Sequence, residues 1–200
     1  MRGEYYHKRA LERQEMRAAK RGGALSGGIE EVKEYPLSDA DIQKLLGGTS
    51  IFTYPELANM SHIDECFDDK GRAIMLFLTT GPAEGHWICM LKKGDTIEYF
   101  DPYGEAPEQE KKWLSKEMLE KLGQDEPYLK RLMAASGYKI IVNKHKFQKD
   151  GGDINTCGRH CVVRCLYAPY SLAQYAKVIK SSGMSPDDFV GALTADMLKK

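Results

Sequence analysis

The stretch AIMLFLTTGPAEGHWICMLKKGDTIEYFDPYG, residues 73–104, holds three apolar runs separated by short polar segments. The runs AIMLFLTT, HWICMLKK and TIEYFDPYG are rich in aliphatic and aromatic residues, which favours β-strands. The segments GPAEG and KGD between them are short enough for antiparallel turns. We therefore expect three neighbouring antiparallel strands at the centre of the fold.

Helical patterns lie on both sides of this stretch, and a further strand is predicted at 138–143 (YKIIVN). In the first helix Ser38 is a candidate N-cap, and Gly47 fits the position that ends it. The other predicted helices span 108–122, 126–136, 171–183 and 185–198, with one more that begins at Cys157. The sequence thus predicts an α+β fold with a central, mostly antiparallel sheet flanked by helices.

The chain divides into an N-terminal extension and one domain. Residues 1–21 contain more Lys and Arg than Asp and Glu and few large apolar residues, and GGALSGG at 22–28 is typical of a flexible linker. We assign 1–34 to a basic tail with its linker and 35–200 to the domain. The positive charge of the tail is compatible with weak DNA binding, with a solvated extension as the alternative.

The composition restricts the cellular setting. The 29 basic and 29 acidic residues cancel, so overall charge favours no class of partner. No run of about 18 apolar residues indicates a membrane span, and the N-terminus lacks the apolar core of a signal peptide. The five cysteines are an odd number, which argues against a secreted disulfide framework and for a reducing intracellular compartment.

Three cysteines lie four residues apart in INTCGRHCVVRC, residues 154–165, and would share one face of a helix. Asn155 or Thr156 could cap this helix, so Cys157 falls in its first turn, where the helix dipole stabilises a thiolate. Cys161 and Cys165 lie deeper among apolar residues and fit core positions.

A zinc site formed by these three cysteines and His160 is the alternative. A single helix cannot arrange four ligands tetrahedrally, and we therefore predict no metal.

Two further residues complete a possible catalytic set. His86 follows a turn at the start of one predicted strand, and Asp101 ends the next strand. In an antiparallel pair these positions are neighbours, so Asp101 can orient the imidazole. Gln148, on the loop that leads to Cys157, could stabilise an oxyanion together with the Cys157 backbone N–H. The residues thus predict a Cys-His-Asp arrangement.

The ordered motifs His86-Trp87, Asp101, Gln148 and Cys157-Gly158 resemble those of cysteine peptidases related to the adenovirus maturation protease (adenain) and the Ulp-type SUMO proteases. YFDPYG resembles the adenain acidic motif with Asp in place of Glu, and CGRHC resembles the Cys-Gly-x-x-Cys helix start. The likeness covers about residues 70–168. The loop between Gln148 and Cys157 departs from the pattern by its length and its paired glycines.

The resemblance implies the adenain-like fold and a thiol endopeptidase with Cys157, His86, Asp101 and Gln148 as catalytic residues. It also implies that Trp87 and Gly158 contribute to substrate binding. No cofactor is expected.

The implied partners are capsid or polyprotein precursors cleaved after Gly-Gly-type sites during viral maturation, in a virion or infected cell, with no membrane. A virophage or another large-DNA-virus system is a candidate source. Two alternatives stay open: a deSUMOylase or deubiquitinase-like isopeptidase, and an acetyltransferase with the same catalytic order.

The linker itself contains a sequence of the type that the resemblance implies as a substrate. Residues 25–28 read LSGG, followed by Ile29. Because such a polar, glycine-rich segment is accessible to proteases, we predict self-cleavage between Gly28 and Ile29, with an ordinary flexible linker as the alternative.

Overall fold

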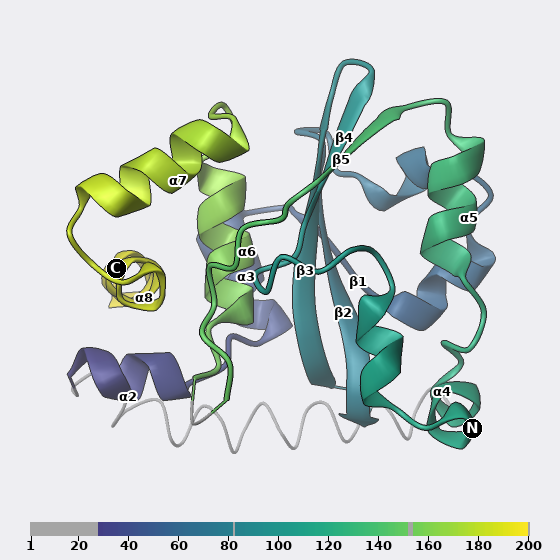
Figure 1. The fold of residues 1–200 in the computed structure, drawn as a ribbon, viewed down its shortest axis with the longest axis horizontal. Coiled ribbons are helices and arrows are strands. Elements are labelled where there is room, and N and C mark those ends of the chain that lie inside the picture. The colour runs from purple at the N-terminus through teal and green to yellow at the C-terminus, as the bar shows by residue number, and fades with distance from the viewer. Residues whose placement is uncertain (1–27, 82, 152–153, 200) are drawn as a thin grey trace.

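The structure, a computed structural model, describes residues 28–81, 83–151 and 154–199. A five-stranded sheet lies at its centre, with the strands side by side in chain order (Figure 1). The strands are β1 (Ser50–Thr53), β2 (Arg72–Gly81), β3 (Glu84–Lys93), β4 (Thr96–Phe100) and β5 (Lys139–Val142). The α+β class and the three adjacent strands predicted from the sequence are confirmed.

The sheet is mixed, and the prediction of a mostly antiparallel sheet needs correction. The hairpins β2–β3 and β3–β4 are antiparallel. Both edge strands, β1 and β5, are parallel to their neighbours. The physical reason is the length of the connections, because 54–71 and 101–138 are long enough to cross back to the same end of the sheet.

Helices and 3-10 turns cover both faces of the sheet (Figure 1). One face carries α3 (Asp39–Leu46), α6 (Cys157–Leu166), α7 (Leu172–Ser181) and α8 (Pro186–Lys199). The other carries α5 (Tyr128–Ala135) and the turns η1 (Tyr54–Asn59) and η2 (Ile63–Cys66). The long connection after β4 also holds η3 (Gln109–Trp113) and α4 (Lys116–Leu122).

The continuous apolar run of β2 follows from burial on both faces. Ile74, Leu76 and Leu78 belong to the core under α6. The intervening residues Met75 and Phe77 belong to the core on the opposite face. A strand covered on both sides needs no polar alternation, and β2 therefore has the sequence of a central strand.

The helix predicted over 108–122 is interrupted, which corrects the sequence-based expectation. Its first part is the 3-10 turn η3, and α4 begins only after Ser115. The Ser115 side chain accepts a hydrogen bond from the Met118 N–H and so caps α4. The backbone before η3 is also non-helical, since Glu108 has a φ of 65°. The Ser115 cap therefore starts α4 as a separate helix after η3, and the left-handed Glu108 marks the start of η3.

The sequence predicts that the domain begins at residue 35, but the folded part begins earlier. Residues Ile29–Glu34 form a helix, α2, beside α8. The Lys33 ammonium lies 2.8 Å from the Asp188 carboxylate of α8, and the Lys33 carbonyl accepts the Asn155 N–H at 2.8 Å. These contacts attach α2 to both α8 and the segment that precedes α6.

The predicted self-cleavage site lies at the limit of the described residues. Gly28 has an extended backbone and directly precedes Ile29, the first residue of α2. The rest of the LSGG motif, and the tail to which weak DNA binding was assigned, fall in 1–27, outside the described residues. Cleavage between Gly28 and Ile29 stays a prediction.

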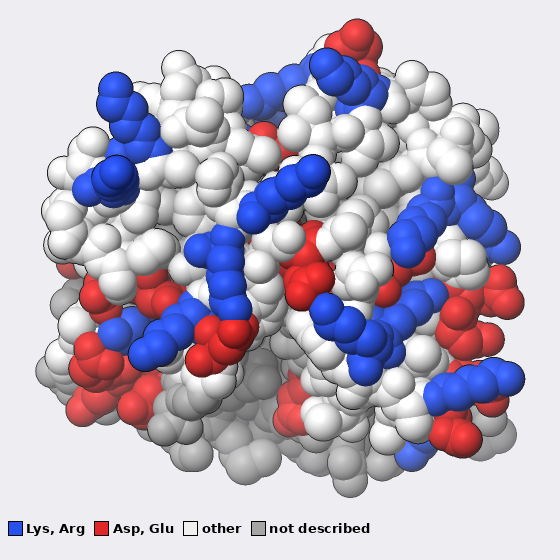
Figure 2. Space-filling model, in the orientation of Figure 1, with Lys and Arg blue, Asp and Glu red and all other residues white. Residues whose placement is uncertain are grey.

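Charged side chains of both signs lie among one another on the face shown in Figure 2. This agrees with the zero net charge of the chain. None of the helices formed by the described residues is both long and apolar enough to cross a membrane.

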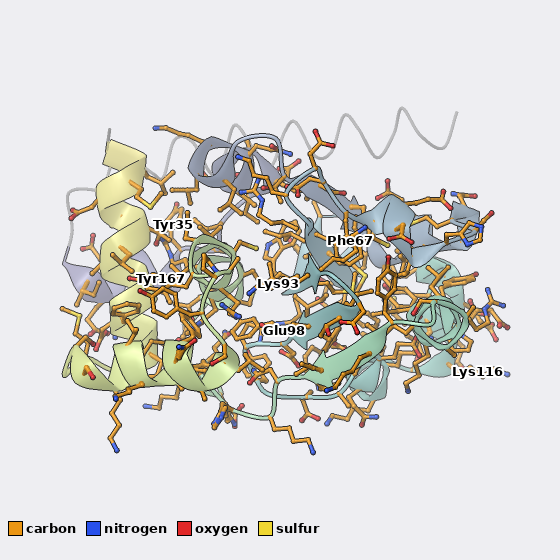
Figure 3. All side chains as sticks on the ribbon, turned by 90° about the horizontal axis from the view of Figure 1, so that it is seen from above. Tyr35, Phe67, Lys93, Glu98, Lys116 and Tyr167 are labelled. Carbon is orange, nitrogen blue, oxygen red and sulfur yellow. The ribbon has the colours of Figure 1, made fainter. Side chains whose placement is uncertain are left out.

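A buried ion pair joins α6 to the sheet. The fully buried Arg164 donates from Nε and Nη2 to the two carboxylate oxygens of Glu98 on β4, at 2.7 and 2.9 Å. Its guanidinium also donates to the Tyr167 and Tyr170 carbonyls. Glu98 and Tyr167 are labelled in Figure 3. These hydrogen bonds all come from the Arg164 side chain.

We expect Arg164→Ala to lower the free energy of unfolding by about 3–5 kcal/mol, because it leaves the Glu98 charge without its partner in a largely buried position. Urea denaturation measures the change. Arg131→Ala is the matched control, since Arg131 is exposed and lies 3.9 Å from Glu126; it should change stability by less than about 0.5 kcal/mol. Equal stability of the two variants would contradict this role of Arg164.

Candidate active site

The first residue of α6 is Cys157, at the position predicted from the sequence. Thr156 occupies the N-cap position but makes no side-chain capping bond, which corrects the expectation that it or Asn155 caps the helix. Burial opposes ionisation of Cys157, yet the hydrogen bond and charge of His86 and the Trp87 and Gly158 backbone N–H groups lower the pKa of the thiol. Cys157 thus has the electrostatics of a reactive thiol.

Cys161, one turn further along α6, has the opposite environment. It is fully buried, its Sγ donates to the Trp87 carbonyl at 3.3 Å, and burial raises its pKa to about 11. All five cysteines lie in the described residues and carry free, buried thiols. Position on the helix therefore separates the reactive thiol from the core thiols, as the sequence predicts.

The third residue of β3 is His86, and Asp101 directly follows β4. The antiparallel register pairs Cys89 with Phe100, which brings the start of β3 close to the end of β4. The His86 Nε2 atom lies 2.7 Å from Asp101 Oδ1, and both side chains are buried. The predicted His-Asp pair is therefore formed.

The turn after β4 fixes the Asp101 carboxylate. Oδ1 accepts the Tyr103 N–H at 2.9 Å, and Oδ2 accepts the Glu105 N–H at 3.2 Å. Burial opposes protonation of His86, but its hydrogen bonds to Asp101 and Cys157 and the charges of both raise the pKa of His86 to about 10. A lowered thiol pKa and a raised imidazole pKa together favour a thiolate–imidazolium pair at neutral pH.

Two aromatic residues that the sequence did not single out as site residues enclose His86. The Tyr103 ring stacks on the imidazole with centroids 4.8 Å apart, and the Trp113 ring meets it edge-on at 5.4 Å. Trp113 is 41% exposed. Tyr103 could have been found from its place in YFDPYG, whereas η3 gives no signal for Trp113.

The sequence also gave no indication of Glu110, a buried acid beside the His-Asp pair. Its Oε1 accepts the Tyr99 hydroxyl at 2.8 Å, and its buried Oε2 makes no hydrogen bond. His86, Asp101 and Glu110 are the described residues whose ligand atoms lie within 4.8 Å of one another, as a metal site requires. However, the 2.7 Å contact is a hydrogen bond and backbone amides occupy the Asp101 oxygens, so we interpret the group as a His-Asp pair with a neighbouring acid.

Trp87 and Gly158, which the resemblance implies for substrate binding, are packed between neighbouring segments instead. Trp87 is 7% exposed, and its Nε1 donates to the Leu37 carbonyl at 3.2 Å. A Cβ atom at Gly158 would lie 3.1 Å from the Trp87 ring and 3.2 Å from Leu37 Cβ. Both residues therefore let α6 approach β3 closely, and neither lines the cavity described below.

A cavity of about 470 Å³ lies beside Cys157, lined by His86, Tyr103, Trp113, Gln148 and Cys157 among others. Gln148 is therefore in the same cavity as Cys157, as an oxyanion donor must be. Its Nε2 donates to the Ile154 carbonyl at 3.3 Å, which occupies one of the two N–H groups, and its buried Oε1 makes no hydrogen bond with the described residues. One amide hydrogen stays available to a substrate.

We expect Gln148→Ala to lower kcat by roughly 10²–10³ if Gln148 is an oxyanion donor, because it removes a preorganised hydrogen bond to the developing charge. The measurement is steady-state kinetics with any substrate that acylates Cys157. Gln43→Ala is the matched control and should leave kcat unchanged. It removes an amide that donates to the Thr49 carbonyl, and neither residue lines the cavity. An unaltered kcat in Gln148→Ala would assign the oxyanion site to another donor in 149–156.

Fold and site together define an α+β protein with an assembled Cys-His-Asp constellation. The chain is 33% identical over 175 residues to a protein of the Sputnik virophage named "Uncharacterized protein V9", an alignment that covers 83% of this chain and 99% of the virophage protein. The chain therefore belongs to the family of that virophage protein. No protein-family model matches it. The viral relative is compatible with the expected viral or host-cell setting.

Proposed function

We propose that this protein is a thiol endopeptidase of the adenain and Ulp type, with Cys157 as nucleophile. The observation that carries the proposal is the buried His86–Asp101 pair at 2.7 Å, joined to a Cys157 whose pKa is lowered. A structural cysteine has no need of this arrangement, and Cys161 of the same helix lacks it. The adenain-like fold itself is part of this proposal.

The geometry supports a proposed role for each group. Because Asp101 binds Nε2 of His86, Nδ1 is the ring nitrogen that remains for the Cys157 proton. The thiolate attacks a peptide carbonyl, and the Gln148 amide with the Cys157 backbone N–H stabilises the oxyanion. His86 then gives its proton to the leaving amine, and water attacks the resulting thioester with His86 as its base.

The substrates we propose are viral precursor proteins cleaved after Gly-Gly-type sites. The viral relative supports the setting, and the resemblance of the ordered motifs supports the cleavage type. The open cavity beside Cys157 gives an extended peptide access to the thiol.

A substrate panel tests this function. Purified protein is incubated with capsid-protein precursors, short peptides containing Gly-Gly, ubiquitin and SUMO precursors, and acetyl-CoA with an acceptor protein. We expect cleavage of precursors and Gly-Gly peptides by the wild type and none by Cys157→Ala. Preference for folded ubiquitin or SUMO would assign an isopeptidase instead, and acetyl transfer without cleavage would overturn the peptidase function.

A further inference from the structure

One carboxylate of α8 joins three segments around the nucleophile. Asp187 is 5% exposed, and its Oδ2 accepts the Lys149 N–H at 3.1 Å. Its Oδ1 accepts the Thr156 hydroxyl and lies 3.0 Å from Nε2 of His160. Burial opposes the charge of Asp187, but the bonds from His160 and Thr156 outweigh it and lower its pKa. All three donors therefore face an ionised carboxylate.

Two of these donors lie directly beside the residues proposed to bind the oxyanion. Lys149 follows Gln148 directly, and Thr156 precedes Cys157 directly. Asp187 thus holds both ends of the connection between the oxyanion donor and the nucleophile. On its other side this connection is attached near Asp101, since the N–H groups of Phe147 and Gln148 donate to the Pro102 carbonyl at 2.8 and 3.0 Å.

His160 completes the arrangement from one turn further along α6. It is fully buried, and burial lowers its pKa, so the neutral ring donates from Nε2 to Asp187. The Thr156 hydroxyl also donates to Asp187, whereas it makes no side-chain capping bond to α6. The helix start is fixed to α8 instead.

We propose that Asp187 is a positioning residue that sets the Gln148 amide and the Cys157 backbone N–H at the separation an oxyanion requires. The inference rests on the proposed function, because it assigns a support to the oxyanion site of that function. Asp187 itself touches neither His86 nor Cys157 through any hydrogen bond of the described residues. Its loss should therefore affect oxyanion formation and leave the thiolate–imidazolium pair intact.

Two small reagents separate these properties. Iodoacetamide alkylates a thiolate without forming an oxyanion, whereas p-nitrophenyl acetate acylates it through a tetrahedral oxyanion. Asp187→Asn puts an NH₂ group opposite one of the three donors. We expect Asp187→Asn to alkylate at the wild-type rate and to acylate roughly 10²-fold more slowly, the effect of a displacement of about 1 Å in a catalytic group.

Asp188→Asn is the matched control, since Asp188 is also in the first turn of α8 but its carboxylate pairs with Lys33 and Ser185. It removes the same charge and should leave both rates unchanged. Thr156→Val removes one donor while keeping the carboxylate, and should give a smaller selective loss of acylation. If Asp187→Asn does not fold, Thr156→Val is the variant that tests the positioning role.

A folded Asp187→Asn with both rates unchanged, or with both reduced by the same factor, would overturn the positioning role. The same two results for Thr156→Val would do so if Asp187→Asn is unfolded. If Cys157 of the wild type reacts with neither reagent faster than a free thiol, the proposed function fails together with the inference. The rates of the wild type therefore distinguish failure of the proposed function from failure of the positioning role alone.

Discussion

Cys157→Ala is expected to abolish peptidase activity completely while the protein stays folded. No second thiol can replace Cys157, because the pKa of the neighbouring Cys161 is raised by burial and its Sγ donates to the Trp87 carbonyl. The loss in kcat should be roughly 10⁶-fold, the usual cost of removing the nucleophile of such a triad. Cleavage of a precursor protein, followed by gel electrophoresis and mass spectrometry, measures it.

Cys161→Ala is the matched control on the same face of the same helix. It removes a fully buried sulfur and should reduce stability without removing activity. Circular dichroism and thermal unfolding confirm the folded state of both variants. An inactive but folded Cys161→Ala beside an active Cys157→Ala would show that the nucleophile has been assigned to the wrong cysteine.

Asp101→Asn is expected to lower kcat by about 10²–10⁴, the usual contribution of acid-base catalysis. The hydrogen-bond pattern predicts how the amide will lie. Oδ1 faces two groups, His86 and the Tyr103 N–H, and Oδ2 faces only the Glu105 N–H, so the amide nitrogen should take the Oδ2 position. The ring would then keep its orientation and lose only the negative charge that stabilises its protonated form.

This loss has a predicted sign in the pH profile. The charge of Asp101 is one of the causes that raise the pKa of His86, and the His86 charge in turn lowers the pKa of Cys157. Without the Asp101 charge the imidazole loses its proton at lower pH, and the thiol ionises at higher pH. The acid limb of the rate profile should therefore move to higher pH in Asp101→Asn, whereas Asp95→Asn, in the exposed β3–β4 turn, should not move it. A profile unchanged in Asp101→Asn would remove Asp101 from the mechanism.

The parts of the site predicted from the sequence are those that local rules determine. A turn before His86, an acidic residue at the next strand end and a cap-like segment before Cys157 suffice to place these three residues. Their convergence then depends only on antiparallel pairing of consecutive strands, which short turns impose. The structure brings the three together as expected.

The parts that the sequence did not reveal depend on contacts distant in the chain. The four-residue strand β1 is too short to show a pattern, and its parallel pairing with β2 is a tertiary contact. Trp113 and Glu110 reach His86 because Glu108 turns the chain into η3 with a positive φ, which no local pattern indicates. For Asp187 the sequence shows only a helix start at Ser185-Pro186, with no sign that its carboxylate reaches Lys149 and Thr156.

His86 is expected to keep Cys157 ionised below the normal pKa of a thiol. The most direct test is the rate of Cys157 alkylation by iodoacetamide as a function of pH, with the modified residue identified by mass spectrometry, in the wild type and in His86→Ala. We predict that alkylation of Cys157 rises at lower pH in the wild type than in His86→Ala, which should react rapidly only near or above about pH 8.5, the pKa of a free thiol. The same rise near pH 8.5 in both proteins would contradict the account.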